Sequence, residues 1–229
     1  MVTAATLTGI EIFGSLSTED REALAANCDS HSYATDQQII AYSDKSTDVY
    51  FIVSGTVRAT IYSTSGKEVA FRDLAAGQLF GDLSAIDDMP RSATVVALTD
   101  SLIVSMPADV FWDAMMRYPE ICAATLKNLT ALVRLLCDRV VEFSTMGVKK
   151  RIYAELLRLA TRQAQNDNSA VISPTPTHAE IASLVSTHRE AVTREMSHLA
   201  QAGLIERRDG TLVVLDVAEL ARIAQGQDD

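Results

Sequence analysis

The chain has 229 residues, of which 48% are hydrophobic and 22% are charged. This length and composition supply enough apolar material for two ordinary domains and exclude a wholly disordered chain. The net charge of −10 at pH 7 excludes a surface that is basic throughout, as nucleic-acid-binding proteins often have.

The acidity is concentrated in the first two thirds of the chain. Residues 148–229 carry ten basic and eleven acidic side chains, whereas residues 1–147 carry ten and nineteen, a balance of −9. Clustered basic residues near the C-terminus are therefore still compatible with DNA binding. Because the first ten residues hold no basic segment and no run of about 18 apolar residues occurs, neither a signal peptide nor a membrane span is expected.

The three cysteines, Cys28, Cys122 and Cys137, are far apart and form no CxxC pair or metal-ligand cluster. An odd number of widely spaced thiols is typical of a reduced, cytoplasmic protein. We therefore expect a cytoplasmic location, no metal and no disulfide. Each cysteine is interpreted as a small buried apolar residue.

Residues 28–107 consist of short, apolar, β-rich segments. Turn signals at Gly55, Ser65-Gly66 and Gly77 separate them. The expected strands cover residues 49–53, 56–62, 68–74, 92–98 and 101–106. Several short strands with regular turn signals predict a barrel or a sandwich.

Residues 120–145 contain no glycine or proline and show a heptad rhythm. Its two apolar positions hold Leu126, Val133 and Val140 and, three residues on, Leu129, Leu136 and Phe143. β-branched residues at the first position and mostly leucine at the second favour a parallel two-stranded coiled coil. The seam is flanked by Lys127, Arg134, Asp138 and Glu142. We expect a homodimer, and a helix that packs on its own domain is the alternative.

The next segment is expected to lead away from the long helix. Gly147 ends or bends that helix, and residues 149–163 form a second amphipathic pattern. Residues 166–176 are largely polar and contain two prolines. This composition predicts a loop, with a short strand at residues 171–172.

Residues 177–201 predict two short helices joined by a tight turn. Thr177 and Glu180 fit a capping box, in which the threonine accepts from a helical amide and the glutamate reaches back. Thr187 and Glu190 fit a second capping box ten residues later. The buried faces are supplied by Ile181, Leu184, Val185, Val192, Met196 and Leu199. Two short helices in this arrangement form a helix-turn-helix.

The second of these helices begins with side chains suited to DNA recognition. Arg189, Glu190 and, about one turn later, Arg194 stand near its start, after Thr187 and His188. Such positions reach base edges in the major groove. Arginine binds guanine O6 and N7 and glutamate accepts from cytosine N4, each contributing roughly 1–3 kcal/mol of discrimination. The alternative is that these are ordinary solvated charges.

Residues 204–214 predict a strand, an Asp209-Gly210 turn and a return strand, which is the hairpin wing of a winged helix. Arg207 and Arg208 lie on this wing, where they could contact backbone phosphate. Charge also protects an exposed strand edge, so a solvated edge is the alternative.

These segments together resemble a known family. Residues 181–215, above all STHREAVTREMSHLAQAGLIERR, resemble the winged helix of the cAMP receptor protein and fumarate-nitrate regulator (Crp/Fnr) superfamily. Residues 80–83 (FGDL) and 90–94 (PRSAT) resemble the phosphate-binding cassette of its cyclic-nucleotide β-roll, and the likeness spans about residues 12–217. It implies an α+β fold with a jelly-roll-like β-roll that binds cyclic nucleotides (1–117), a long dimerisation helix (118–146) and a winged helix-turn-helix that binds DNA (147–229).

The resemblance implies a cyclic-nucleotide site at Gly81, Asp82, Leu83, Arg91 and Ser92. A guanidinium fork and a hydroxyl can replace the hydration of a cyclic phosphate, which suits Arg91 and Ser92. Gly81 lets the backbone approach the ligand, and the Asp82 carboxylate can accept from a ribose 2′-hydroxyl.

Two positions depart from the family pattern. The family usually has glutamate where this chain has Asp82, so a shorter carboxylate must reach the ribose. Where the best-known member contacts adenine with a Thr-Ser pair, this chain has Leu136 and Cys137, which offer at most a weak donor. The resemblance therefore implies a cyclic nucleotide, cAMP or cGMP, and leaves its base open.

The resemblance also implies a homodimeric regulator that binds double-stranded DNA, with RNA polymerase as a further partner. Arg189, Glu190 and Arg194 match the family's base-reading residues, so TGTGA-like half-sites are expected about 34 Å apart. The effector is expected to reorder the dimer helix, which turns the two winged helices toward successive major grooves.

Several alternatives stay open. A regulator with a degenerate pocket would act without a nucleotide, and a cyclic-nucleotide regulatory subunit would not bind DNA. An enzyme is not expected, since no nucleophile–base motif, HExxH or P-loop is recognised. An iron–sulfur cluster needs about four cysteines, more than are present. A haem would find only His31 upstream of His178, and His31 is interpreted as a core or surface residue.

Overall fold

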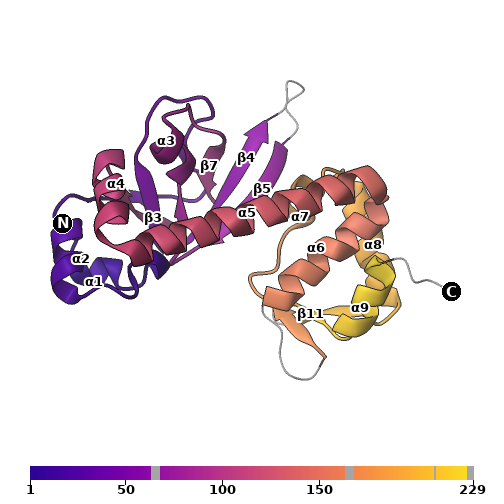
Figure 1. Cartoon of the computed structure of the whole chain (residues 1–229). Helices are drawn as coiled ribbons and strands as arrows, with labels where there is room; N and C mark the ends of the chain where they lie inside the picture. The colour runs from indigo at the N-terminus through magenta and orange to yellow at the C-terminus, as the bar shows by residue number, and fades with distance from the viewer. Residues whose placement is uncertain (63–67, 163–167, 209, 226–229) are drawn as a thin grey trace. The chain divides into compact units, whose positions relative to one another are not determined.

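The computed structural model describes residues 1–62, 68–162, 168–208 and 210–225 (Figure 1). The chain divides into two compact units, Met1–Arg134 and Leu135–Asp229, and the long helix α5 (Pro119–Thr145) contributes to both. Six residues of the predicted turns, helix and loop lie outside the described residues: Ser65, Gly66, Gln163, Asn166, Asp167 and Asp209.

The first unit is built on two antiparallel four-stranded sheets, ordered β1-β8-β3-β6 and β2-β7-β4-β5. The strands are β1 (Asp29–Tyr33), β2 (Gln38–Ile40), β3 (Val49–Ser54), β4 (Thr56–Tyr62), β5 (Glu68–Ala75), β6 (Leu79–Phe80), β7 (Thr94–Ala97) and β8 (Ser101–Met106). β4 and β8 have the expected bounds, and β3 and β5 each extend one residue further. The two packed sheets confirm the predicted β-roll.

Strand β3 shows why this part of the sequence is continuously apolar. Successive residues of a strand point to opposite faces of the sheet. Phe51 belongs to a core shared with the helices, and Ile52 belongs to the core between the two sheets. Both side chains are fully buried, and each burial stabilises the fold by about 1.5–3 kcal/mol.

Short helices cover the outer face of the β3 sheet. They are α1 (Ala4–Leu7), η1 (Glu11–Phe13), α2 (Thr18–Ala25), α3 (Asp82–Asp87) and α4 (Ala108–Arg117). Phe13, Phe111 and Ile121 are fully buried in the core that these helices share with the start of α5. The indole Nε1 of Trp112 on α4 donates to the carbonyl oxygen of Ala85 on α3 at 2.7 Å. This bond joins α3, the helix of the predicted cassette, to the helix that precedes α5.

The apolar seam of α5 is exposed in the single chain. The exposed fractions are 59% for Leu126 and for Val133 and 64% for Val140. Glu142, one of the polar residues expected to flank this seam, is buried. It is 8% exposed and pairs with Arg158 of α6 (Val148–Arg162). Periodicity along one helix does not show what a neighbouring helix places against it.

The second unit packs helices around a three-stranded antiparallel sheet, ordered β10-β11-β9. After α6 its elements are β9 (Ala170–Ile172), α7 (His178–Leu184), α8 (Arg189–Gln201), β10 (Ile205–Arg208), β11 (Thr211–Val214) and α9 (Val217–Ala224). Ile152, Val192 and Leu212 meet in its core. The predicted fold class is confirmed. No helix in the described part of the chain is long and apolar enough to cross a membrane.

Candidate effector and DNA-binding sites

Arg91 of the first unit is buried, with 2% of its surface exposed. Its guanidinium donates from Nε to Ser46 Oγ (3.0 Å), from Nη1 to the Gly81 carbonyl (2.9 Å) and from Nη2 to the Asp48 carbonyl (2.8 Å). The Tyr50 ring lies 5.5 Å from the guanidinium carbon. Burial lowers the pKa of Arg91, because desolvation of the cation outweighs the nearby groups that favour it. A buried cation held by neutral oxygens is suited to bind an anion.

Gly81 is required at its position for two reasons. Its φ of +82° lies in the left-handed region, which glycine adopts without strain. A Cβ here would also lie 2.8 Å from Arg91 Nη1 and 2.9 Å from the Asp48 carbonyl oxygen. The close approach of the Arg91 guanidinium to this backbone therefore depends on glycine.

Asp82 begins α3 and is 5% exposed. Burial raises the pKa of its carboxyl group, and the charge of Arg72 on β5 is the largest opposing influence. The backbone amides of Asp82 and Leu83 also favour the carboxylate, as amides at a helix N-terminus do.

The structure brings five of the seven predicted effector residues together around the start of α3. Leu83 and Ser92 are exposed there, beside the buried Asp82 and Arg91. Leu136 and Cys137 lie on α5 in the second unit and are both exposed. Their part in recognising the nucleotide base stays a prediction.

The cysteines correct one expectation. Cys28 and Cys122 are half-buried, whereas Cys137 is exposed on α5 and is not the buried apolar residue that was expected. Burial raises the pKa of the Cys28 thiol to about 12, so this thiol stays protonated at neutral pH. Among the described residues, no three or more His, Cys, Asp and Glu side chains are grouped so as to hold a metal ion.

The turn between α7 and α8 differs from the predicted one. Thr177 and Glu180 form the expected capping box. The second predicted box, at Thr187 and Glu190, is wrong, because the N-cap of α8 is His188 and its side chain makes no capping hydrogen bond.

Thr187 instead closes the preceding helix. Its amide donates to the Ala182 carbonyl (2.9 Å), and the Ser186 amide donates to the Ser183 carbonyl (3.4 Å). This pairing is a Schellman motif, with Ser186 in the left-handed region at a φ of +51°. The backbone amide of Thr187 therefore closes α7, and Thr187 lies one residue before the N-cap of α8.

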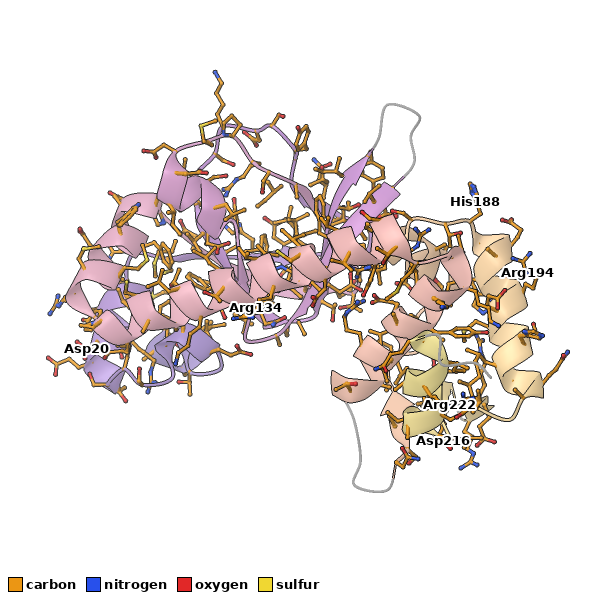
Figure 2. All side chains as sticks on the ribbon, turned by 45° about the vertical axis from the view of Figure 1, so that its right-hand side comes forward. Asp20, Arg134, His188, Arg194, Asp216 and Arg222 are labelled. Atoms are coloured by element: carbon orange, nitrogen blue, oxygen red, sulfur yellow. The ribbon has the colours of Figure 1, made fainter. Side chains whose placement is uncertain are left out.

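The predicted base-reading residues lie on the solvent side of α8. Arg189 and Glu190 are exposed, and so are His188 and Arg194, which are labelled in Figure 2. Arg194 Nε lies 3.3 Å from Glu195 Oε1, yet 74% of the Arg194 side chain is accessible. Val192 on the same helix is fully buried. Helix α8 thus has a charged face toward solvent and an apolar face packed in the core of the unit.

The wing arginines are held differently. Arg207 Nη2 lies 3.4 Å from His178 Nε2, and His178 Nδ1 lies 2.8 Å from Thr193 Oγ1. Burial lowers the pKa of His178, and the charges of Arg207 and Arg189 lower it further. Arg208 forms an ion pair with Glu206 on its own strand.

Sequence reasoning missed the residues that hold Arg91. Ser46, Asp48 and Tyr50 lie more than 40 residues before it, and two of its acceptors are backbone carbonyls, which no side-chain pattern reveals. It also missed His178, which links the first helix of the helix-turn-helix to α8 and to the wing. Its position directly after the capping threonine was the available signal.

Comparison with protein families agrees with this geometry. Residues 30–118 match the cyclic nucleotide-binding domain, and residues 150–223 match the Crp-like helix-turn-helix domain. The CRP-like cAMP-activated global transcriptional regulator of Mycobacterium tuberculosis is 27% identical over 188 residues, covering 82% of this chain and 84% of that protein. The cyclic AMP receptor protein of Thermus thermophilus is 28% identical over 222 residues, covering 95% and 98%.

A solved structure shows the same fold. A mutant of CooA from Carboxydothermus hydrogenoformans superposes with a TM-score of 0.80 at 19% identity, covering 93% of this chain and 94% of that one. The order of a β-roll, a long helix and a winged helix is shared along nearly the whole chain. The chain belongs to the Crp/Fnr superfamily of transcription regulators.

Proposed function

We propose that the chain is a homodimeric transcription regulator whose DNA binding is gated by a cyclic nucleotide, cAMP or cGMP. The observation that carries this proposal is the buried guanidinium of Arg91, held by neutral oxygens beside α3 and next to exposed Ser92. The names of the two relatives, both of which refer to cAMP, support it. The regulator acts in the cytoplasm on double-stranded DNA, with RNA polymerase as a further partner.

In this proposal Arg91 and Ser92 bind the cyclic phosphate. Exchange of a neutral carbonyl partner for a phosphate oxygen makes the acceptor an anion as well as the donor a cation, which adds Coulomb attraction to the hydrogen bond. Gly81 lets the ligand approach the backbone, Asp82 accepts from the ribose hydroxyl and Leu83 lines the site. Leu136 and Cys137 are the residues that we assign to the base, and the preference between cAMP and cGMP is left to the titration.

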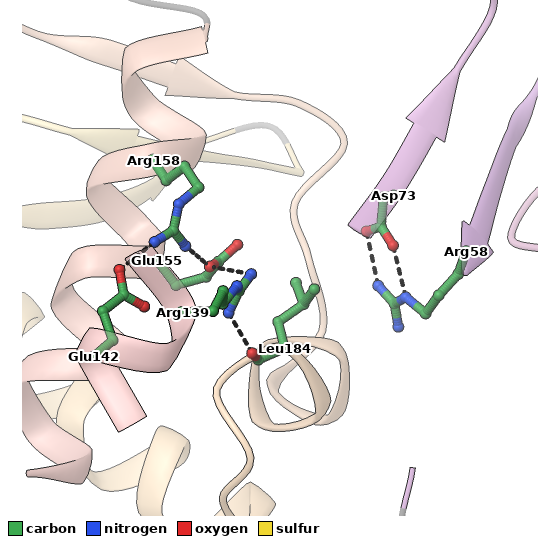
Figure 3. Close-up of polar contacts among 7 residues, drawn as sticks. All are labelled: Arg58, Asp73, Arg139, Glu142, Glu155, Arg158 and Leu184. Atoms are coloured by element: carbon green, nitrogen blue, oxygen red, sulfur yellow. Dashed lines mark hydrogen bonds and ion pairs between the residues drawn. The ribbon is translucent and has the colours of Figure 1, made fainter. Parts of the chain in front are cut away.

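Calorimetric titration of the whole chain with cAMP and with cGMP tests the effector site. We expect Arg91→Met to weaken binding by roughly a hundredfold or more, because each charge-assisted hydrogen bond contributes about 1.5–3 kcal/mol. Arg58→Met is the matched control, since Arg58 is equally buried in the same unit and forks to Asp73 at 2.7 and 2.8 Å (Figure 3). The fluorescence of Trp112, the one tryptophan, reports whether each variant is folded.

Two results would contradict the effector assignment. If Arg91→Met binds a nucleotide as tightly as the parent chain, the cassette is not the site. If neither nucleotide binds the parent chain and DNA affinity does not respond to either, the protein is a regulator with a degenerate pocket.

The exposed seam of α5 supports the homodimer. Val133 and Val140 are large apolar residues more than half exposed, and a second copy of the same helix would bury them. We expect Val140→Glu to convert the dimer into a monomer in sedimentation analysis. Arg134→Glu is the control, because Arg134 is exposed on the same helix beside the seam (Figure 2). A parent chain that sediments as a monomer contradicts the proposal.

Base recognition is assigned to Arg189, Glu190 and Arg194, with Thr187, His188, Arg207 and Arg208 at the phosphate backbone. We expect Glu190→Ala to relax preference at one base pair of a TGTGA-like half-site by about 1–3 kcal/mol. Competition between single-base variants of a palindromic duplex measures this. Gln201→Ala, at the exposed far end of α8, is the control. Equal weakening on random DNA would rule out base readout.

A further inference from the structure

A chain of four alternating charges, three of them buried, lies in the second unit (Figure 3). Glu142 and Arg139 come from α5, and Glu155 and Arg158 come from α6. Arg158 Nη2 lies 2.5 Å from Glu142 Oε1, Arg158 also pairs with Glu155, and Arg139 Nη2 lies 2.9 Å from Glu155 Oε2. Two arginines and two glutamates make the cluster electrically balanced, which is what burial of charges requires.

This cluster ends on the helix-turn-helix. Arg139 Nη1 donates to the carbonyl oxygen of Leu184, the last residue of α7. The carbonyls at the end of a helix have no partner inside that helix. The carbonyls of Ala182 and Ser183 accept from backbone amides of the turn that follows α7. The carbonyl of Leu184 accepts from a side chain of α5 instead. A cation is also favoured at this end of a helix dipole.

Arg139 is therefore bound to two elements at once. One arm of its guanidinium reaches α6 through Glu155, and the other reaches α7 two residues before the left-handed Ser186. The apolar core of this unit packs without a preferred direction, whereas a planar guanidinium fork fixes both distance and angle. Buried ion pairs of this kind add little stability over apolar residues of the same volume.

We propose that Arg139 is a positioning residue that sets the angle between the dimer helix α5 and the helix-turn-helix. A movement of α5 is passed through Arg139 to the end of α7, and from there through the Ser186 turn to the recognition helix α8. Glu155 and Arg158 hold Arg139 in the required rotamer. The role in gating rests on the proposed function, because it supposes that an effector moves α5.

The test measures how strongly cAMP and cGMP change the affinity for a palindromic TGTGA-like duplex. In Arg139→Met, Glu155 keeps Arg158, so no buried carboxylate loses all its partners. We expect the ratio of affinities with and without the nucleotide to fall about tenfold or to unity, while calorimetric nucleotide affinity without DNA stays unchanged. Arg139→Lys, whose ammonium group cannot bind two acceptors as a planar fork, should give an intermediate ratio of affinities. Its free energy of unfolding should stay nearly unchanged. Arg222→Met is the control, since it alters an Arg–Glu pair on α9 that is partly exposed.

Hydrogen exchange gives a second reading that needs no nucleotide. The amides of Ser186 and Thr187 should exchange faster in Arg139→Met than in the parent chain or in Arg222→Met. If these amides exchange at the parent rate and the affinity ratio is retained, the positioning role is refuted. If the parent chain shows no nucleotide dependence, gating itself fails, and the exchange rates alone decide whether Arg139 orients the turn.

Discussion

Arg91 of the first unit and Arg139 of the second are both buried, and their different partners fit the two different roles that we propose for them, effector binding and positioning. Arg91 in the first unit donates to two backbone carbonyls and a serine hydroxyl, and none of the ion pairs found among the described residues involves it. Arg139 in the second unit is equally buried but pairs with the Glu155 carboxylate. A cation with neutral partners keeps its charge for an anion, whereas a neutralised cation holds the fold.

The largest expected effect is on the paired arginine. Glu155→Gln leaves Arg139 and Arg158 with Glu142 as the only carboxylate among the four residues of the cluster. Loss of one partner from a buried ion pair costs about 3–5 kcal/mol. Ser46→Ala, the corresponding change at Arg91, removes a neutral acceptor and should cost only about 1 kcal/mol.

Urea unfolding measures both variants. Circular dichroism follows the helices of both units, and Trp112 fluorescence follows the first unit alone. Equal losses in the two variants would show that carboxylate and hydroxyl partners hold a buried arginine equally well, which would break the comparison.

A second prediction concerns the space around Arg91. Gly81→Ala places a residue with a Cβ at a φ of +82°, which costs about 1–2 kcal/mol, and also displaces the guanidinium. Gly203→Ala is a matched control with a φ of +70° and no atom within 4 Å of the added Cβ. We expect similar backbone strain in both variants and loss of nucleotide binding only in Gly81→Ala. Nucleotide binding retained by Gly81→Ala would contradict the crowding argument.

The comparison also explains what could be predicted from the sequence. Strands such as β4 and β8, the exposed seam of α5 and the outward face of α8 follow from periodicity and turn residues, which are local. The partners of Arg91 and Arg139 are not local. Arg91 is held by the Asp48 carbonyl, 43 residues earlier, and by the Ser46 hydroxyl, 45 residues earlier, and Arg139 reaches an acceptor 45 residues later in the chain.

The wrong prediction of a capping box at Thr187 and Glu190 also comes from contacts that are distant in the sequence. A Ser-Thr pair before a charged helix start fits two motifs, an N-cap for α8 and a closing turn for α7. The choice of the second depends on how α7 ends, which involves Arg139 of another helix. A pattern of residue types within ten positions does not contain that information.

The wing extends the comparison to exposed arginines. Arg207 lies beside the neutral ring of His178, whereas Arg208 is already paired with Glu206. We expect Arg207→Ala to reduce the slope of log affinity against log salt by about one, as loss of one phosphate contact does. Arg208→Ala should change the slope much less. The reverse order would show that pairing within the wing does not predict which arginine meets DNA.

The smallest expected effect is a pH dependence at His178. Its pKa is lowered from the ordinary 6.5 by burial and by the charges of Arg207 and Arg189, so the unfolded chain takes up this proton more readily than the folded chain. The contribution of the neutral ring to stability is therefore complete above pH 6.5 and is lost as pH falls through the lowered folded value. His178→Gln keeps a polar side chain without the titration. Between about pH 7.5 and about pH 5.5, the parent chain should lose more unfolding free energy in urea than His178→Gln does. Parallel pH profiles would mean that the titration of His178 does not contribute to stability and that its ring is not held neutral beside Arg207.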